Sequence, residues 1–363
     1  MSDVVFILGA GASKDAGAPV MSEFFSSSRD LFAKGLVGGA EESFRNVFEV
    51  IGNLQRLHSK CDIDLQNVES VFTVLEMADT LGKLPGISPE NIKSRISDLK
   101  ALISKTVEQT VLFEIDRGTE IQLPPTYGRF CDLIKFLQRE ADPPRTVAVI
   151  TFNYDVVVDR SLAQKGLRPD YCIENETQGV RLLKLHGSLN WLRCPICGRI
   201  QVLDLMQKQA PDFFEDKNVP QQKIKVPMPL SRWLTEFNCC EHKRSNEPLI
   251  VPPTWNKSDY HKVMLPVWRT AVEELESAEN IFVIGYSFPQ SDAFFHHLYG
   301  LGSLSEKPLR RFWVFNPDTE TVEGRFRRLL GTGVHRIFEY HPQKFNEAIS
   351  TIANAFGAGK YSV

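Results

Sequence analysis

Polar side chains follow two apolar segments of the chain, at the points where buried strands are expected to end. Asn153 and Asp155 come directly after the segment 146–151, and His186 follows the segment 181–185. In open parallel sheets, ligands bind beyond the carboxyl ends of the strands, so these side chains are candidates for one site. An imidazole that titrates near neutral pH suits general base catalysis. We therefore expect His186 to act as a base, with Asn153 and Asp155 beside it.

Each of these residues also has a purely structural interpretation. Asn and Asp are good helix-capping residues, so Asn153 and Asp155 could simply start the next helix. A lone histidine is more often structural than catalytic, although the glycine after His186 leaves room for a substrate. The convergence of several polar strand ends in one parallel sheet favours a functional site.

A glycine turn follows the first apolar segment, residues 3–8. Glycines there let the backbone turn tightly and approach a pyrophosphate, whose charge is stabilised by N–H groups at a helix start. The dehydrogenase fingerprint needs a glycine where this chain has Lys14, and no Gly-Lys-Ser/Thr follows as in a P-loop. A plain structural turn is the alternative. The candidate phosphate-binding residues are Gly9, Ala10, Gly11, Ala12 and Ser13, followed further on by Pro19.

Two later strand ends carry small or amide side chains. The segments 280–284 and 311–315 are apolar and are followed by Gly-Tyr-Ser and Asn-Pro-Asp. Such residues can meet a second phosphate and an adenosine, or they can simply form turns. The candidates are Gly285, Tyr286, Ser287 and Asn316.

The seven cysteines include a cluster after position 190. An odd number in a chain without a recognisable signal peptide favours thiols or metal ligation over a disulfide framework. A Cys-x-x-Cys pair and a later group of thiols and an imidazole can supply four tetrahedral zinc ligands. Reduced thiols without metal are the alternative. The candidate ligands, of which four would bind zinc, are Cys194, Cys197, Cys239, Cys240 and His242.

The periodicity of the chain predicts an α/β fold. Continuous apolar runs at 3–8 and 146–151 indicate buried parallel strands, 181–185 is a strand of more mixed character, and 280–284 and 311–315 are two further strands. Between the first two strands, apolar residues recur at helical spacing, so roughly residues 22–140 are mostly helical. The helical stripes are Phe44, Val47, Phe48, Ile51 and Leu54; Ile92, Ile96, Leu99, Ile103 and Val107; and Phe130, Leu133, Ile134 and Leu137.

Composition sets broad limits on function. The 363 residues are 42% hydrophobic and 24% charged, which is typical of a folded globular protein and excludes a mainly disordered chain. A net charge of -3, from 42 basic and 45 acidic residues, provides no global attraction to nucleic acid or to acidic membranes. The apolar runs are far shorter than a membrane helix requires. We expect a cytoplasmic protein that binds neither membranes nor nucleic acid directly.

The order of the motifs resembles that of the sirtuin-like family, specifically its divergent bacterial branch associated with phage defence. Along the chain the motifs are GAGAS and GAP, FNYD, LHGS, a Cys-x-x-Cys segment, IGYS and FNPD. The resemblance covers most of the chain except the helical stretch at about 22–140, which is longer than in sirtuin deacylases. As an ordered set the motifs are specific, although each one alone is not.

The resemblance implies a Rossmann-like parallel sheet, a small zinc-binding module and NAD as the ligand, and the helical stretch at about 22–140 is then a large helical insertion. It assigns Asn153 and Asp155 to the nicotinamide ribose and His186 to catalysis. It places residues 9–13 at the pyrophosphate. The remaining cofactor residues are Pro19 in the cofactor loop, Ser287 with Gly285 and Tyr286 in the later loop, and Asn316 near the adenosine ribose.

The periodicity, the change in composition after Trp191 and the resemblance together divide the chain into parts. A Rossmann-like NAD-binding domain would comprise residues 1–21, 141–190 and 249–356. The helical insertion would be 22–140, the cysteine-rich module 191–248, and the tail 357–363.

Two departures from the sirtuin deacylases bear on the reaction. Where those enzymes continue the cofactor loop with Asp-Phe-Arg, Pro19 is followed here by Val-Met-Ser, and residues 249–257 replace the segment that binds the acyl-lysine peptide. We therefore expect NAD⁺ hydrolysis to nicotinamide and ADP-ribose. The alternatives are protein deacylation or ADP-ribosyl transfer at the same site, and a non-catalytic module that senses NAD or ADP-ribose.

Continuous NAD⁺ hydrolysis would deplete a shared metabolite, so regulation is expected. The resemblance suggests a homo-oligomer or a partner ATPase of the ring-forming, DNA-translocase type, acting in anti-phage defence.

Overall fold

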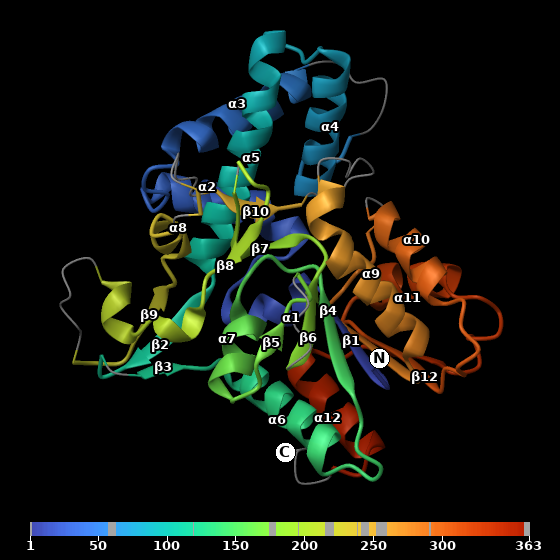
Figure 1. Cartoon of the computed structure of the whole chain (residues 1–363). Helices are drawn as coiled ribbons and strands as arrows, with labels where there is room; N and C mark the ends of the chain where they lie inside the picture. The colour runs from blue at the N-terminus through green and yellow to red at the C-terminus, as the bar shows by residue number, and fades with distance from the viewer. Residues whose placement is uncertain are drawn as a thin grey trace.

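A seven-stranded parallel sheet forms the centre of the molecule (Figure 1). The computed structural model describes residues 2–56, 63–118, 120–173, 179–194, 196–214, 221–237, 239–240, 247–251, 260–289 and 292–358. The strand order is β13-β12-β11-β1-β4-β6-β5, and every neighbouring pair is parallel. The strands are β1 (Val4–Leu8), β4 (Val147–Thr151), β5 (Pro169–Asp170), β6 (Val180–Lys184), β11 (Asn280–Ile284), β12 (Arg311–Phe315) and β13 (Phe338–His341).

Helices cover both faces of this sheet and also form a bundle beside it. The helices are α1 (Ala10–Ser13), α2 (Phe24–Ala33), α3 (Glu41–Arg56), α4 (Val68–Leu81), α5 (Pro89–Thr110), α6 (Pro125–Arg139), α7 (Val157–Gln164), α8 (Leu230–Leu234), α9 (His261–Ser277), α10 (Ala293–Gly302), α11 (Thr319–Leu329) and α12 (Phe345–Ala355). Short 3₁₀ helices lie at Lys14–Ala16, Met21–Glu23, Leu205–Gln207 and Ala210–Phe213.

The central strand explains why the sheet is covered on both sides. Successive side chains of a strand point to opposite faces, and all five residues of β1 are buried. Phe6 belongs to a core that includes residues of α6, α7 and α12, whereas Ile7 belongs to a second core with residues of α9, α10 and α11. The continuous apolar run in the sequence is thus the pattern of a strand buried on both faces.

The predicted strands and helical stripes are confirmed, and the α/β class with them. All five predicted strands are in the sheet, and the three apolar stripes lie on α3, α5 and α6. The edge strands β5 and β13 were not predicted. Within the stretch expected to be mostly helical, β2 (Leu112–Asp116) and β3 (Glu120–Gln122) form a small antiparallel sheet with β9 (Ile224–Pro227).

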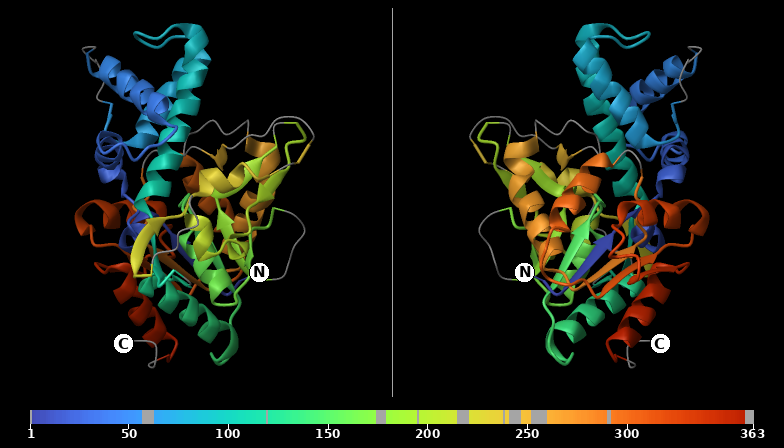
Figure 2. Two further views of the ribbon diagram at one scale, coloured as in Figure 1. Left: turned by 90° about the vertical axis from the view of Figure 1, so that its left-hand side faces the viewer. Right: turned by 90° about the vertical axis from the view of Figure 1, so that its right-hand side faces the viewer.

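Helices α3, α4 and α5 rise from one side of the body as a bundle (Figures 1 and 2). The carboxyl end of α5 meets the turn that follows β1. There, Gly17 has a positive φ of 99°, and a Cβ at this position would lie 2.2 Å from the carbonyl oxygen of Thr110. The bundle is therefore anchored directly against the predicted phosphate-binding turn.

A third sheet has three antiparallel strands. Strand β7 (Gly187–Arg193) pairs with β10 (Pro248–Ile250) and with β8 (Ile200–Val202), both antiparallel. The first cysteine pair follows β7. Among the described residues, no helix combines the length and apolar character needed to cross a membrane.

Candidate functional site

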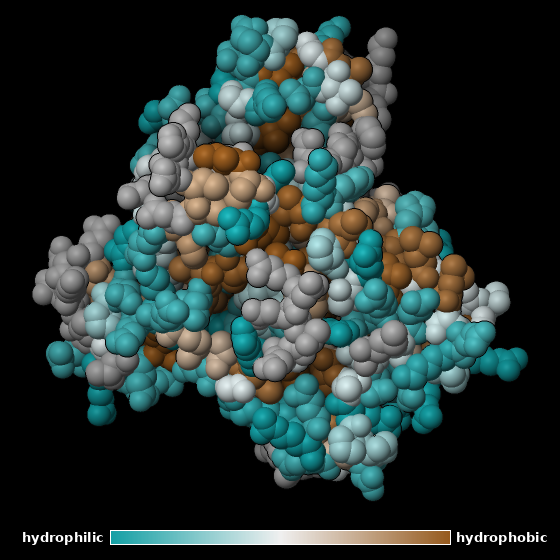
Figure 3. Space-filling model, viewed as in Figure 1, coloured by the Kyte–Doolittle hydropathy of each residue, from teal (hydrophilic) through white to brown (hydrophobic). Residues whose placement is uncertain are grey.

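A large cavity opens at the carboxyl edge of the parallel sheet, where β1 lies between β4 and β11. The chain winds outward from β1 to β4 and later returns to the opposite side as β11, which is the point where ligands bind in such sheets. The cavity has a volume of about 900 Å³, near the upper end of the range for ligand pockets. Figure 3 shows hydrophobic side chains gathered between the helical bundle and the body below it.

Most of the site residues expected from the sequence meet in this cavity. They come from turns after five strands of the sheet, β1, β4, β6, β11 and β12, while α4 and α5 supply the opposite wall. Gly9, Ala12 and Ser13 do not line the cavity, but Gly9 and Ser13 are hydrogen-bonded to Asn153, which does. The predicted residues that line it are Ala10, Gly11, Pro19, Asn153, Asp155, His186, Gly285, Tyr286, Ser287 and Asn316.

The glycine turn after β1 is packed against the turn after β11. The backbone N–H of Gly11 donates to the carbonyl oxygen of Gly285 at 2.9 Å. A Cβ on Gly11 would lie 2.9 Å from the Cα of Gly285, and a Cβ on Gly9 would lie 2.5 Å from the Cα of Tyr286. Glycine is thus required here for the close approach of two backbones, and this approach shapes the floor of the cavity.

We expect Gly285→Ala to be strongly destabilising. Gly285 has a φ of +64°, and an added Cβ would lie 2.4 Å from the backbone nitrogen of Ala12. The left-handed conformation and the steric overlap together cost about 2–5 kcal/mol of unfolding free energy. Urea unfolding followed by circular dichroism measures this loss.

Gly128→Ala in α6 is the matched control for this substitution. Its Cβ would find only the Cε of Lys165, at 3.9 Å, and alanine favours a helix over glycine by about 0.5–1 kcal/mol. An unfolding midpoint of Gly285→Ala equal to that of the wild type would refute the close packing of the two turns.

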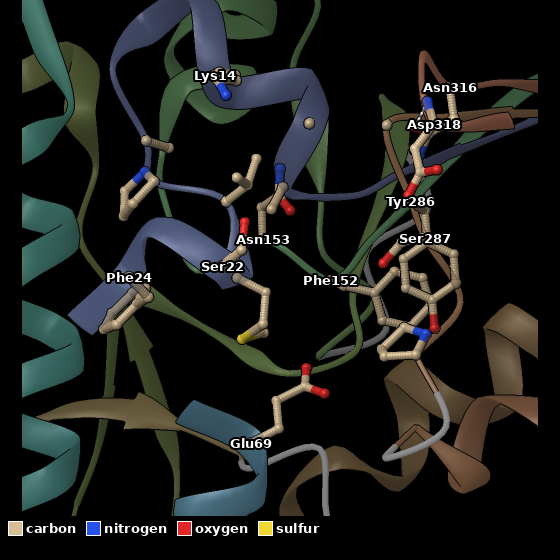
Figure 4. A pocket seen from close by; sticks show the side chains of 18 of the residues that line it. Lys14, Ser22, Phe24, Glu69, Phe152, Asn153, Tyr286, Ser287, Asn316 and Asp318 are labelled. Carbon is tan, nitrogen blue, oxygen red and sulfur yellow. Dashed lines mark hydrogen bonds between the residues drawn. The ribbon is translucent and has the colours of Figure 1, made fainter. Parts of the chain in front are cut away.

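Asn153 connects the end of β4 to the glycine turn. Its side chain is 9% exposed, and Nδ2 donates to the carbonyl oxygen of Gly9 and to Oγ of Ser13, both at 2.9 Å. The Ser13 hydroxyl is also hydrogen-bonded to the hydroxyl of Tyr127 at 2.8 Å. Asn153 therefore has a structural role in fixing the turn as well as a place in the cavity wall (Figure 4).

Asp155 accepts a hydrogen bond from the first residue of the following helix, α7, and also lines the cavity, so the two interpretations from the sequence are not exclusive. Its Oδ1 accepts a hydrogen bond from the backbone N–H of Val157 at 3.0 Å. Burial raises the pKa of Asp155, and the ammonium group of Lys184 opposes that rise. Lys184 is fully buried and donates to the carbonyl oxygen of Asp155 at 2.5 Å and to Oδ2 of Asp159 at 2.9 Å. The buried ion pair between Lys184 and Asp159 joins the end of β6 to α7 behind the cavity.

His186 lies just beyond the end of β6 and is 4% exposed. Its ring packs edge-on against Phe152, with centroids 5.2 Å apart. Its Nε2 lies 3.8 Å from Oδ2 of Asp292, which also accepts a hydrogen bond from the hydroxyl of Tyr286 at 2.7 Å. The imidazole thus faces the cavity from a largely dry, aromatic surrounding with a carboxylate beside it.

The far end of the cavity is built from the turns after β11 and β12. Arg325 of α11 donates to the carbonyl oxygen of Ser287 at 3.1 Å, which ties the two turns together. Oδ1 of Asn316 accepts a hydrogen bond from the backbone N–H of Asp318 at 3.0 Å, so this motif does form the turn that was the alternative interpretation. Figure 4 shows Asn316 and Asp318 close together at one end, beyond Ser287.

Sequence reasoning missed two buried acidic residues of the cavity, Glu69 and Asp292. Glu69 is 7% exposed and lies in the first turn of α4, and Figure 4 shows its carboxylate pointing into the cavity. Asp292 caps α10, because its Oδ1 accepts from the backbone N–H of Phe295 at 3.3 Å. The available signal was in each case an Asx residue just before a helical stripe, Asn67 for α4 and Asp292 for α10.

Four cysteines gather at a second place, beyond the end of β7. The Sγ atoms of Cys194, Cys197, Cys239 and Cys240 all lie within 4.8 Å of one another. The Sγ–Sγ distance is 3.8 Å for Cys194 and Cys240, and 3.5 Å for Cys197 and Cys239. Tetrahedral zinc with Zn–S bonds of about 2.3 Å places its sulfur ligands about 3.8 Å apart. The four thiols therefore fit a zinc ion, whereas His242 lies outside the described residues.

Comparison with solved structures finds Sir2 proteins. A complex of a Sir2 homologue with NAD aligns over 98% of this chain and 91% of its own, with 15% sequence identity and a TM-score of 0.41. A mutant of a Sir2 homologue bound to ADP-ribose covers 98% and 94%, with 16% identity and a TM-score of 0.40. Sir2Tm bound to a propionylated peptide covers 98% and 94%, with 13% identity and a TM-score of 0.38. No protein-family model and no curated protein matches the sequence.

Proposed function

We propose that this protein binds NAD⁺ in the cavity and hydrolyses it to nicotinamide and ADP-ribose. The observation that carries the proposal is the meeting of Asn153 and His186 with the glycine turn in one cavity at the carboxyl edge of the sheet. A turn in which two backbones approach closely suits a pyrophosphate, and an amide and an imidazole suit the sugar that reacts. The resemblance of the ordered motifs to sirtuin-like proteins supports the same ligand.

The proposed reaction consumes one water molecule. The water oxygen forms a bond to C1′ of the nicotinamide ribose while the bond from C1′ to the ring nitrogen breaks, and its electron pair returns to nicotinamide. The ring nitrogen is already positively charged in NAD⁺, so departure needs no general acid. The sugar passes through an oxocarbenium-like state, as in glycoside cleavage.

The side chains have distinct proposed roles in this reaction. His186 accepts the proton that the water loses, and later releases it to solvent. Asn153 orients the water or the ribose hydroxyls, while its Nδ2 holds the carbonyl of Gly9. Asp155 fixes the local hydrogen bonds and favours the positive charge that develops at the sugar. Gly11, Ser287 and Asn316 would face the pyrophosphate and adenosine portions of the cofactor.

Water is the proposed acceptor because residues 249–257 replace the segment with which the sirtuin deacylases bind the acyl-lysine peptide. The wall opposite the sheet is supplied by α4 and α5 and carries the largely buried carboxylate of Glu69. Protein deacylation and ADP-ribosyl transfer would use the same cavity with a different acceptor.

The direct test is release of nicotinamide and ADP-ribose from NAD⁺ by the purified protein, with and without an acetyl-lysine peptide. We expect both products in equal amounts without peptide. Release only in the presence of peptide would replace hydrolysis by acyl or ADP-ribosyl transfer. Calorimetric binding of NAD⁺ without release under either condition would leave a sensing module, and no binding would overturn the proposed ligand.

We further propose that the protein is a regulated effector of bacterial anti-phage defence, acting in the cytoplasm. The resemblance to defence-associated sirtuin-like proteins supports this role, and so does the cost to a cell of continuous NAD⁺ loss. Control would come from assembly into a homo-oligomer or from a partner ATPase of the DNA-translocase type. Light scattering of the purified protein, with turnover measured over a range of protein concentrations, tests the first of these.

A further inference from the structure

We propose that Asp292 is a positioning residue for His186, holding the imidazole in the orientation and tautomer in which it can accept a proton. The inference deepens the proposed function and rests on it. Asp292 is reached only after the turn that follows β11, whereas His186 follows β6, so the pair joins opposite sides of the sheet's central strand.

The carboxylate of Asp292 lies close to the imidazole of His186. Oδ2 of Asp292 lies 3.8 Å from Nε2 of His186, which is an ion-pair distance and slightly longer than a hydrogen bond. Hydrogen bonds of catalytic groups are often long before the substrate binds and shorten in the complex. Asp292 and His186 are 1% and 4% exposed, so water screens their interaction only weakly.

Tyr286 holds the carboxylate in place. Its hydroxyl donates to Oδ2 of Asp292 at 2.7 Å, the same oxygen that faces His186. Burial, with the charge of Asp292 as the next cause, raises the pKa of Tyr286 well above its usual value. The hydroxyl therefore stays protonated and remains a donor to the carboxylate.

Phe152 links the two rings. It stacks on Tyr286 with centroids 4.0 Å apart and an angle of 5° between the planes, and it meets His186 edge-on with centroids 5.2 Å apart. Figure 4 shows Phe152 and Tyr286 overlapping at one side of the cavity. Because the three rings pack together, the imidazole has little freedom to turn away from Asp292.

This arrangement has a chemical consequence for the proposed base. A carboxylate facing Nε2 favours the tautomer that carries its proton on Nε2, so the other ring nitrogen is the one that can accept a proton. Once that proton is taken up, the adjacent negative charge stabilises the imidazolium. A buried aspartate beside a catalytic histidine has this effect in serine proteases, where the matching Asp→Asn change lowers kcat about 10⁴-fold with the geometry intact.

Asp292 also caps α10, and the test must separate this structural role from the positioning role. Asparagine is as good a cap as aspartate, so Asp292→Asn keeps the cap and removes the charge. Asp292→Glu keeps a charge but is a poorer cap. A merely structural residue would make the Glu variant the more damaging one in every measurement.

We expect Asp292→Asn to lower kcat for nicotinamide release by about 10²–10⁴-fold, with KM for NAD⁺ changed less than about threefold. Its unfolding midpoint should stay at the wild-type value. In the His186→Ala background the same substitution should cause no further loss, because Asp292 acts through the imidazole. Unchanged kcat in Asp292→Asn, or an equal loss in both backgrounds, would overturn the inference.

A nitrogen-15 spectrum of the histidine rings gives a readout that does not depend on turnover. The signal absent from His186→Ala identifies His186, and we expect it to show the proton on Nε2 in the wild type and a different tautomer balance in Asp292→Asn. If the wild type releases no nicotinamide, the hydrolase proposal fails while this spectrum still decides the pairing. An identical His186 signal in both proteins rejects the pairing itself.

Discussion

Replacing His186 by alanine is expected to lower nicotinamide release from NAD⁺ by about 10²–10⁴-fold, the usual contribution of a positioned base. Binding of NAD⁺ should change little, because the described hydrogen bonds of the glycine turn do not involve this ring. His186→Gln keeps more of the side-chain volume against Phe152 and should show the same loss of kcat. Measurement of kcat and KM for both variants, with circular dichroism to verify folding, tests the assignment.

Asn153→Ala should differ from the histidine variants in a diagnostic way. It removes the donor to the carbonyl of Gly9 and to Oγ of Ser13, so the turn expected to hold the pyrophosphate loses its restraint. We therefore expect a higher KM as well as a lower kcat. His297→Ala, an exposed histidine on α10, is the control that should retain wild-type turnover. Wild-type turnover in both His186→Ala and Asn153→Ala would remove the proposed active site.

The sheet was predictable from sequence wherever a strand is buried on both faces. The five residues of β1 and the five of β4 are all apolar or small and all buried, so they form continuous runs that no helix pattern matches. Strand β13 has only one buried residue among four, and β5 has two residues in all. Edge strands of this kind carry too little apolar signal to be recognised without their neighbours.

The site was predictable to the extent that its residues directly follow strands. Asn153 and His186 each come two positions after a strand, β4 and β6, and strand ends of a parallel sheet converge by topology alone. Glu69 and Asp292 belong to helix starts instead. Their approach to the cavity depends on how α4 and α10 pack against the sheet, and local sequence does not encode that packing.

The cysteine cluster leads to the second large expected effect, which concerns stability. We expect one zinc per chain in the purified protein, and we expect Cys194→Ser or Cys239→Ser to lose it. Structural zinc contributes about 10–16 kcal/mol to the folding of small zinc domains. Even a fraction of that value, about 3–5 kcal/mol, corresponds to a fall in Tm of about 4–7 °C for a chain of this size. Elemental analysis and thermal unfolding, with and without a zinc chelator, measure both quantities.

Substitution of His242 tests which side chains bind the zinc. The four thiols already complete a tetrahedral set, so the imidazole is not needed as a ligand. His242→Ala should keep the metal, and so should Cys172→Ser, whose thiol lies outside the cluster. Loss of zinc in His242→Ala would instead make the imidazole a ligand, and protein that takes up no zinc would refute the site.

Removal of the zinc by a chelator should lower the stability of the protein without changing its binding of NAD⁺. Among the described residues, the cavity lining includes no cysteine, so zinc would act on the fold and not on NAD⁺. Below the lowered Tm, metal-free protein should therefore bind NAD⁺ with unchanged affinity, because Asn153 still holds the glycine turn in place. An immediate loss of NAD⁺ binding on chelation, while the fold persists, would show that the cluster shapes the cavity through β7, the strand that joins His186 to Cys194.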